Sequence, residues 1–458
     1  MNHPSGISIE AYLKPGVHAH LVGIGGVSMR PLGLVLQERG LRITGSDMTK
    51  SLATDELEAQ GIPVAIGHRA ENIQGAALVI RTAAAHDDNP EIAAARAQGI
   101  PVFERAEAWG ILMRSFPNAI CVSGTHGKTT TTSMITQIFM EAQRDPTVMI
   151  GGTLPMLHAS HRVGRGDTII MESCEYCNSF LNFFPTVALI LNIEADHLDF
   201  FKDLQDIQAS FRKFAQLVPA DGLILANGDD ANTLEALRGL SYRTFGMGEE
   251  NFVHGANFRG DWREFDVLCG GVHYAHLTLS VMGRHNAMNA LAACAAAHNA
   301  GIPGDVAARA LRSFTGAGRR MEFKGRYRGA DIYDDYAHHP GELHALLAAA
   351  RGLGYRRILC AFQPHTYSRT KALFYDFVRE LKTVDVAILT DIFAAREKNT
   401  VGVSSQMLAD QIPGAVYCPT LPEVTAYLRA EAGPGDLVLT VGAGDIYKAG
   451  NALLETDA

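Results

Sequence analysis

The sequence predicts three consecutive α/β domains. Apolar runs of strand length alternate with helical patterns along the chain, which is typical of parallel sheets covered by helices. At 458 residues the chain is too long for one hydrophobic core, and 47% hydrophobic with 19% charged residues is the composition of a globular protein. We expect the domains to span residues 1–116, 117–322 and 323–458.

The first domain should contain a parallel sheet with a glycine turn. Gly23, Gly25 and Gly26 close its first strand, and Asp47 ends the second, 22 residues beyond Gly25. A glycine turn before a helix, with a ribose-facing acid at this distance, is the arrangement of dinucleotide-binding folds. The turn reads G-x-G-G-x-S, ending at Ser28, so a tight turn without a ligand is the alternative. The expected strands are His20–Ile24, Leu41–Gly45, Ala77–Ile80 and Pro101–Phe103.

A short phosphate-binding loop opens the central domain. It lies between the apolar run Ala119–Val122 and a helical segment, Thr132–Glu141. Glycines let the backbone approach phosphates, and a helix N-terminus attracts anions. Lys128 would reach the terminal phosphates and Thr129 could ligate Mg²⁺, although the first glycine of a standard P-loop would fall at Val122. The loop comprises Gly124, Thr125, His126, Gly127, Lys128, Thr129 and Thr130.

Two other strand ends of the central domain carry polar side chains. Glu172 follows the run Thr168–Met171, and the segment from Asn192 to His197 closes the run Val187–Ile193. The carboxyl ends of strands border the ligand crevice of an open α/β sheet, so these groups could bind Mg²⁺ around ATP phosphates. For a single polar strand end, a helix cap or a solvated loop is the alternative. Two polar strand ends beside a phosphate loop favour metal and phosphate binding.

The pattern changes after the parallel part of the central domain. Alternating polar and apolar residues between Tyr242 and Val281 predict antiparallel strands, and an alanine-rich helix, Asn286–Asn299, follows. Asn286 alone is typical of a helix N-cap. The junction with the third domain carries Arg319 and Arg320, for which a solvated pair is the alternative to ligand binding.

The third domain again alternates strands and helices. Asp335, His338 and Arg369 lie near its strand ends, where acids, imidazoles and a guanidinium suit a carboxylate-bearing substrate. Taken singly, each histidine is more often a hydrogen-bonded surface residue. The expected strands are Ala330–Tyr333, Ile358–Ala361, Val386–Leu389 and Leu437–Val441.

Charge and composition exclude several classes. The net charge of −9, without a block of Lys or Arg, argues against nucleic-acid binding. The polar N-terminus is not a signal peptide and the apolar runs are too short to span a membrane, so we expect no membrane insertion. Seven scattered cysteines indicate reduced thiols in a cytoplasmic protein. Cys174 and Cys177 form a lone C-x-x-C, for which zinc or redox chemistry is a minor alternative.

In their order along the chain, these motifs resemble the Mur ligase family of ATP-dependent amide-bond-forming enzymes. The resemblance covers essentially the whole chain. It implies a Rossmann-like N-terminal domain that binds UDP, a central P-loop ATPase-type α/β domain and a Rossmann-like C-terminal domain that holds the amino acid. The residues that carry it are the loop 124–130, Glu172, Asn192, His197, Asn286, Asn289, Arg320 and the segment 334–340.

Within the family, segments 23–26, 45–47, 194–197 and 362–365 resemble the member that joins L-alanine to the lactyl carboxylate of UDP-N-acetylmuramate, in cytoplasmic peptidoglycan precursor synthesis. ATP with Mg²⁺ would phosphorylate the carboxylate, and the amine would displace phosphate from the acyl phosphate. One alternative is a recycling ligase that attaches a preformed peptide to the same sugar nucleotide. Two others are a P-loop kinase or hydrolase without ligation, and a non-catalytic UDP-sugar-binding regulator.

The resemblance also implies roles for single residues. Lys128 would contact the β- and γ-phosphates, Thr129 and Glu172 would hold one Mg²⁺, and His197 a second. His338 and Arg369 would face the substrate carboxylate and the incoming amino acid. The nucleotide would be bound by the loop 124–130 together with Asn289, Arg320 and Asp335, and the UDP-sugar by Gly23, Gly25, Gly26, Ser28 and Asp47.

Three positions depart from the family pattern. Ser28 and Arg30 replace residues that are often Gly and Ser, and Thr366 stands where many members have Arg. We therefore expect carboxylate recognition to rest more on Arg369 and His338.

Overall fold

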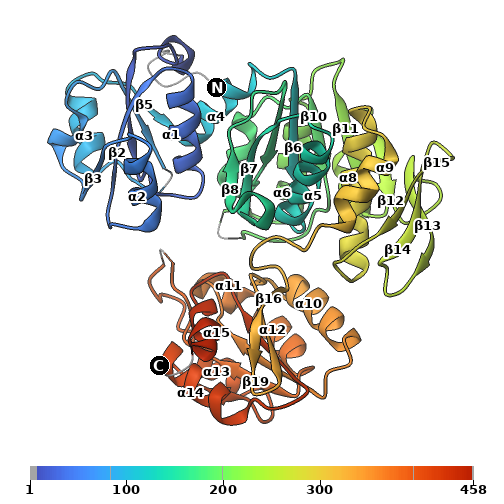
Figure 1. Cartoon of the computed structure of the whole chain (residues 1–458). Coiled ribbons are helices and arrows are strands. Elements are labelled where there is room, and N and C mark those ends of the chain that lie inside the picture. The colour runs from blue at the N-terminus through green and yellow to red at the C-terminus, as the bar shows by residue number, and fades with distance from the viewer. Residues whose placement is uncertain (1–7, 83, 199, 396, 456–458) are drawn as a thin grey trace.

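Three separate β-sheets, each packed with helices, make up the chain (Figure 1). The computed structural model describes residues 8–82, 84–198, 200–395 and 397–455. The N-terminal and central sheets lie side by side, and the C-terminal sheet lies below them in Figure 1. The expected three-part α/β architecture is thereby confirmed, while the boundaries after residues 116 and 322 stay predictions.

The N-terminal sheet is fully parallel, in the order β3-β2-β1-β4-β5. Its strand order reverses at β1, and ligands of open α/β sheets bind at such a switch point. The strands are β1 (His18–Val22), β2 (Arg42–Asp47), β3 (Val64–Ile66), β4 (Leu78–Arg81) and β5 (Val102–Glu104). The helices are η1 (Ile9–Ala11), α1 (Met29–Glu38), α2 (Leu52–Ala59), η2 (Ala70–Ile73), α3 (Pro90–Ala97) and α4 (Arg105–Met113).

The central sheet has ten strands, in the order β15-β14-β13-β12-β11-β10-β6-β9-β7-β8. The strands are β6 (Asn118–Ser123), β7 (Thr147–Leu154), β8 (Ala159–Arg162), β9 (Thr168–Glu172), β10 (Val187–Ile190), β11 (Leu223–Asn227), β12 (Arg243–Gly246), β13 (Val253–Arg259), β14 (Glu264–Cys269) and β15 (Val272–Thr278). The helices are α5 (Lys128–Glu141), η3 (Pro155–Leu157), η4 (Tyr176–Asn182), α6 (Leu204–Ala215), α7 (Ala231–Ala236), α8 (Arg284–Asn299) and α9 (Gly304–Arg312).

Two expectations for this domain need correction. Strand β12 pairs in parallel with both β11 and β13, so the antiparallel prediction holds only for β13, β14 and β15. Helix α8 begins at Arg284 with Gly283 as its N-cap, and the side chain of Asn286 donates to the carbonyl of Met282 instead of capping the helix. The alanines of α8 are buried, and α8 packs closely against α5 because methyl side chains are small.

The C-terminal sheet has the order β16-β17-β21-β18-β19-β20, with β16 as its antiparallel edge strand. The strands are β16 (Glu322–Tyr327), β17 (Ala330–Asp335), β18 (Arg357–Phe362), β19 (Val386–Leu389), β20 (Val416–Tyr417) and β21 (Asp436–Val441). The helices are α10 (Pro340–Gly352), α11 (Tyr367–Ala372), α12 (Phe374–Leu381), α13 (Ser405–Ala409), α14 (Leu421–Glu431) and α15 (Tyr447–Leu454).

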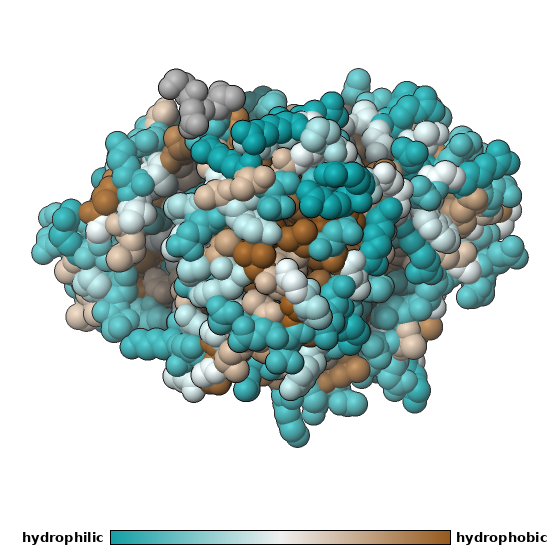
Figure 2. All heavy atoms as spheres, turned by 90° about the horizontal axis from the view of Figure 1, so that it is seen from below, coloured by the Kyte–Doolittle hydropathy of each residue, from teal (hydrophilic) through white to brown (hydrophobic). Residues whose placement is uncertain are grey.

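The face seen from below in Figure 2 is mostly hydrophilic. Its main group of apolar side chains lies near the middle, and smaller ones lie toward the edges. Within the described ranges, no helix combines the length and the apolar character that crossing a membrane requires.

Candidate active site

The phosphate loop turns sharply between β6 and α5. Gly124 and Gly127 have φ of 141° and 83°, values that side chains other than glycine rarely adopt. A Cβ on Gly124 would lie 2.9 Å from Cβ of Leu191, and one on Gly127 would lie 2.7 Å from Oδ1 of Asn289. Val122 is a fully buried residue of β6, so the turn starts after the position where a standard P-loop has its first glycine.

The polar segment after β10 braces this loop. Oδ1 of Asn192 accepts from the backbone N–H of His126 at 2.8 Å, and its Nδ2 donates to the His126 carbonyl at 3.1 Å. The backbone N–H of Glu194 donates to Oγ1 of Thr125 at 2.9 Å. These bonds explain why polar residues follow both β6 and its neighbour β10. The segment after β10 holds the phosphate loop that follows β6.

Lys128 is buried beside a carboxylate. Its ammonium group donates to the carbonyls of Gly124 and Thr125, and to both oxygens of Glu175 at 3.2 and 3.1 Å. Burial lowers the pKa of Lys128, but the charges of Glu175 and Glu172 outweigh burial and leave it raised. The lysine is therefore positively charged in the ligand-free protein, as binding of an anion requires.

Thr129 and Glu172 lie together, as the magnesium prediction requires. Oγ1 of Thr129 donates to Oε1 of Glu172 at 3.1 Å, and the backbone N–H of Gly151 donates to Oε2 at 2.6 Å. A hydroxyl and a carboxylate oxygen are hard ligands of the kind that Mg²⁺ takes.

His197 lies in a different environment. Its Nε2 is 3.8 Å from Oδ2 of Asp196, and its ring packs on Tyr176 with centroids 4.6 Å apart. Within the described ranges, no hydrogen bond or ion pair joins His197 to Thr129 or Glu172. His197 instead lines a small cavity of about 100 Å³ at the contact between the central and C-terminal domains.

Arg369 lines the same small cavity and bridges the two domains. Its Nη2 is 3.2 Å from Oδ1 of Asp196, and its Nη1 is 3.2 Å from Nδ1 of His365. Burial raises the pKa of Asp196, but Arg369 and His197 outweigh burial and hold it below its usual range. The guanidinium predicted to face a carboxylate is thus paired with a carboxylate of the protein itself.

His338 lies close to Arg369 but is neutral. Its Nδ1 is 3.0 Å from the carbonyl of Tyr336 and 3.3 Å from Oε2 of Glu342. Burial lowers the pKa of His338 to about 4, against the charge of Glu342. A buried neutral imidazole can exchange a hydrogen bond with a substrate without adding charge.

The predicted nucleotide ligands from distant segments gather around the loop. Oδ1 of Asn289 accepts from Oγ1 of Thr131 at 3.2 Å, directly beside Gly127. Nη1 of Arg320 is 3.5 Å from Oε1 of Glu342. Asp335 accepts from the backbone next to Arg320, at Met321, and burial raises the pKa of Asp335 to about 6.

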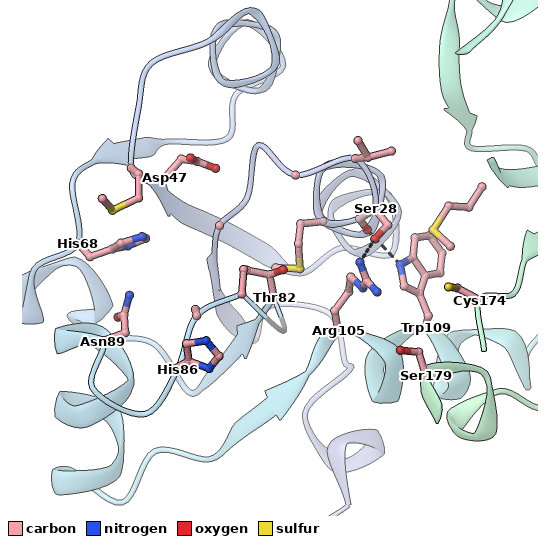
Figure 3. A pocket seen from close by; sticks show the side chains of 18 of the residues that line it. Ser28, Asp47, His68, Thr82, His86, Asn89, Arg105, Trp109, Cys174 and Ser179 are labelled. Atoms are coloured by element: carbon pink, nitrogen blue, oxygen red, sulfur yellow. Dashed lines mark hydrogen bonds between the residues drawn. The ribbon is translucent and has the colours of Figure 1, made fainter. Parts of the chain in front are cut away.

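The glycine turn of the N-terminal domain opens into a cavity of about 1060 Å³ (Figure 3). Gly23, Gly26, Ser28 and Asp47 line it, and Asp47 also accepts from the backbone N–H of Gly25 at 2.9 Å. Asp47 therefore fixes the shape of the turn as well as bordering the cavity.

The same cavity continues into the central domain. Its far wall contains Gly151, Glu172, Cys174 and Ser179. Glu172 thus borders the cavity and also contacts Thr129 of the phosphate loop. A ligand seated at the glycine turn could extend to the place where nucleotide phosphates are expected.

Several side chains in this cavity were not predicted from the sequence. Arg105 donates to the hydroxyl of Ser28, and Nε1 of Trp109 donates to the Ser28 carbonyl at 3.1 Å (Figure 3). Neither belongs to a motif: both lie on α4, which only the tertiary fold brings to the turn. The other unpredicted polar residues that line the cavity are His68, Thr82, His86, Asp88 and Asn89.

Comparison with known proteins gives matches along almost the whole chain. Residues 18–117 match the model of the Mur ligase family catalytic domain, residues 122–297 the Mur ligase middle domain and residues 319–444 the Mur ligase glutamate ligase domain. A UDP-N-acetylmuramate–L-alanine ligase of Caldanaerobacter subterraneus is 44% identical, over 98% of this chain and 99% of the relative.

Two solved structures have similar folds. A UDP-N-acetylmuramate-alanine ligase of Thermotoga maritima has a TM-score of 0.81 and 29% identity, over 96% of this chain and 98% of that one. A murein peptide ligase of Psychrobacter arcticus has a TM-score of 0.73 over the same shares of the two chains, with 23% identity, a level at which the likeness concerns the fold alone.

Proposed function

The chain belongs to the Mur ligase family, and from that premise we propose that it joins L-alanine to the lactyl carboxylate of UDP-N-acetylmuramate with consumption of ATP. The observation that carries this proposal is that Glu172 faces both expected binding sites. It borders the cavity that starts at the glycine turn, and it contacts Thr129 of the phosphate loop at 3.1 Å. A sugar nucleotide in the cavity and ATP on the loop would therefore meet at this carboxylate.

The reaction needs activation because a carboxylate does not condense with an amine in water. The γ-phosphoryl group of ATP passes to a carboxylate oxygen of the acceptor, which gives an acyl phosphate and ADP. The amine of L-alanine then attacks the carbonyl carbon, and the tetrahedral intermediate expels phosphate, loses a proton and forms the amide. Such phosphoryl transfer depends mainly on positioning and on neutralising charge.

The chain's own groups suit these tasks. Lys128 leaves Glu175 to bind the β- and γ-phosphates, and the backbone N–H groups after Gly127 face the same anions. Arg320 and Asn289 hold the nucleotide beside the loop. Arg369 and His338 position the substrate carboxylate and the amino acid, and His338, which is neutral, is suited to bind the attacking amine.

Magnesium fits the residues present. The hydroxyl of Thr129 and the carboxylate of Glu172 supply two oxygen ligands for one Mg²⁺, and His197 is the proposed ligand of a second, near the acceptor carboxylate. Bound at these places, the two cations would neutralise charge on the transferred phosphoryl group. In the ligand-free protein His197 instead contacts Asp196 and Tyr176.

The peptide-recycling ligase is the alternative within the family. The identity of 44% to an L-alanine ligase, over 98% of this chain, favours the single amino acid. Because ATP is a cytoplasmic substrate, and because the cysteines are free thiols, we also propose a cytoplasmic location with a role in cell-wall formation.

One assay tests the proposal against its rivals. Purified protein with ATP, Mg²⁺ and UDP-N-acetylmuramate should release phosphate only when L-alanine is added. Equal turnover with a tripeptide would identify the recycling enzyme. Phosphate release without any amine would identify a hydrolase and overturn the proposal.

A further inference from the structure

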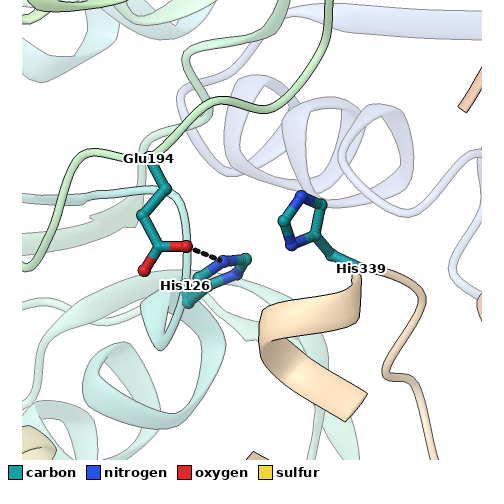
Figure 4. Close-up of side chains that lie close together, drawn as sticks. All are labelled: His126, Glu194 and His339. Carbon is teal, nitrogen blue, oxygen red and sulfur yellow. Dashed lines mark ion pairs between the residues drawn. The ribbon is translucent and has the colours of Figure 1, made fainter. Parts of the chain in front are cut away.

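Three potential metal ligands converge where the phosphate loop meets the C-terminal domain (Figure 4). His126 belongs to the loop, Glu194 follows β10, and His339 precedes α10. One ligand atom from each lies within 4.8 Å of the others. The three residues come from segments that are far apart in sequence, and His339 belongs to a different sheet from the other two.

An open point lies between these three groups. A Cβ on Gly341 would occupy it, at 3.4 Å from Oε2 of Glu194, 3.5 Å from Nδ1 of His339 and 3.6 Å from Nε2 of His126. Because Gly341 has no side chain, the point stays free. The three atoms that surround it are two imidazole nitrogens and one carboxylate oxygen, a ligand set found in zinc sites.

The imidazole nitrogens at this point make few well-formed hydrogen bonds. Within the described ranges, both ring nitrogens of His126 are buried without a well-formed hydrogen bond, and so is Nε2 of His339. Nδ1 of His339 accepts only a long bond, 3.3 Å, from the backbone N–H of Gly341, and a cation bound to Nδ1 would replace this bond. His339 is 7% exposed, so water reaches it poorly.

We propose that His126, Glu194 and His339 bind one zinc-class divalent cation, through Nε2, Oε2 and Nδ1 respectively. Nε2 of His126 and Oε2 of Glu194 are already 3.4 Å apart. Two ligands of a tetrahedral zinc ion lie about 3.3 Å apart, given bonds of about 2.0–2.1 Å. Imidazole ligands favour zinc over magnesium, and three protein ligands leave a fourth position for water.

The surroundings support the ligands. Nδ1 of His126 faces Oε1 of Glu342 at 3.6 Å, and a metal-binding imidazole usually directs its second nitrogen at a carboxylate or a carbonyl. The cation would connect the phosphate loop to the start of α10, and so hold the C-terminal domain against the central one. This site is separate from the Thr129–Glu172 pair and needs neither ATP nor the sugar nucleotide.

Calorimetry with zinc chloride alone, on metal-stripped full-length protein without Mg²⁺, tests the site. We expect one zinc ion per chain. Gly341→Ala keeps all three ligands but fills the point between them, and should weaken binding at least about tenfold. His339→Asn removes a ligand while keeping a residue that caps helices well, and should have the same effect.

The control is the exposed imidazole His276, which lies 2.8 Å from Asp266 on the outer strands. His276→Ala should bind zinc as the unchanged protein does. Three results would overturn the proposal: no stoichiometric binding by the unchanged protein, unchanged binding by Gly341→Ala, or binding lost only in His276→Ala.

Discussion

The ammonium group of Lys128 lies 3.1 Å from Oε2 of Glu175, and only 13% and 3% of the two side chains are exposed. Glu175 therefore neutralises the lysine at the place where nucleotide phosphates are expected. A phosphate oxygen that enters the loop has to compete with this carboxylate for the same ammonium group.

Removing the charge of Glu175 should shift that competition. Glu175→Gln should tighten ATP binding by about threefold to tenfold and lower the stability of the ligand-free protein by about 1–3 kcal/mol, because Lys128 is left buried without its partner. Thermal unfolding with and without ATP measures both effects. A stabilisation by ATP no larger than that of the unchanged protein would contradict this account.

Lys128 should matter for chemistry but not for the sugar nucleotide. Lys128→Ala should lower kcat by about 10²–10³, since a charge that stabilises the transferred phosphoryl group is lost. Calorimetric binding of UDP-N-acetylmuramate should stay the same, because Lys128 does not line the large cavity. Lys202→Ala, an exposed lysine of the same domain, is the control. Loss of sugar-nucleotide binding in Lys128→Ala would show that the two sites are not separate.

Arg105 should contribute to sugar-nucleotide binding, although it belongs to no motif. It lines the cavity and donates to Ser28, so Arg105→Ala should weaken UDP-N-acetylmuramate binding by about 10–100-fold while ATP affinity is unchanged. Arg114→Ala, at the C-cap of the same helix, where the guanidinium stacks on Phe184, is the matched control. Equal affinity for the sugar nucleotide in both variants would rule out a role for Arg105.

Arg369 should determine the affinity for the amino acid. Arg369→Lys keeps the charge but cannot reach Asp196 and His365 together, so the KM for L-alanine should rise by about tenfold or more, with the KM for ATP unchanged. Initial rates at varied L-alanine and ATP measure the two constants. A fall in kcat with both KM values unchanged would point to domain closure instead.

Stability should fall on the alkaline side because of His126. Burial lowers its pKa, but Glu194 and Glu342 outweigh burial and raise it to about 9, above the ordinary value of 6.5. The protonated form therefore stabilises the folded state; this contribution is complete below pH 6.5 and is lost as the pH rises through about 9. It amounts to about 3 kcal/mol.

Chemical unfolding with a chelator present, at pH 6 and at pH 9.5, measures this effect. The loss between the two values should be about 3 kcal/mol larger in the unchanged protein than in His126→Asn, which has no imidazole to titrate. An identical pH dependence in the two proteins would show that the ion pairs of His126 do not stabilise the fold.

Strands were easier to predict from the sequence than helix starts. Val386–Leu389 has the predicted bounds, because a strand buried on both faces is a continuous apolar run. Helix α5 begins at Lys128, four residues before the predicted segment, since its first turn consists of threonines with poor helix propensity. The hydroxyls of Thr129 and Thr131 bond outside the helix, to Glu172 and Asn289, whereas Thr132 donates to the carbonyl of Lys128 at 2.8 Å.

The sequence by itself determined the local features of the binding sites: glycines where φ is positive, a lysine and a threonine at a helix start, and acids at strand ends. These follow from the backbone geometry of a few neighbouring residues. Only the tertiary structure decided that Lys128 pairs with Glu175, that Arg369 pairs with Asp196, and that α4 lines the large cavity. Such pairs depend on how separate sheets and domains pack against one another, and the period of a hydrophobic pattern carries no information about that packing.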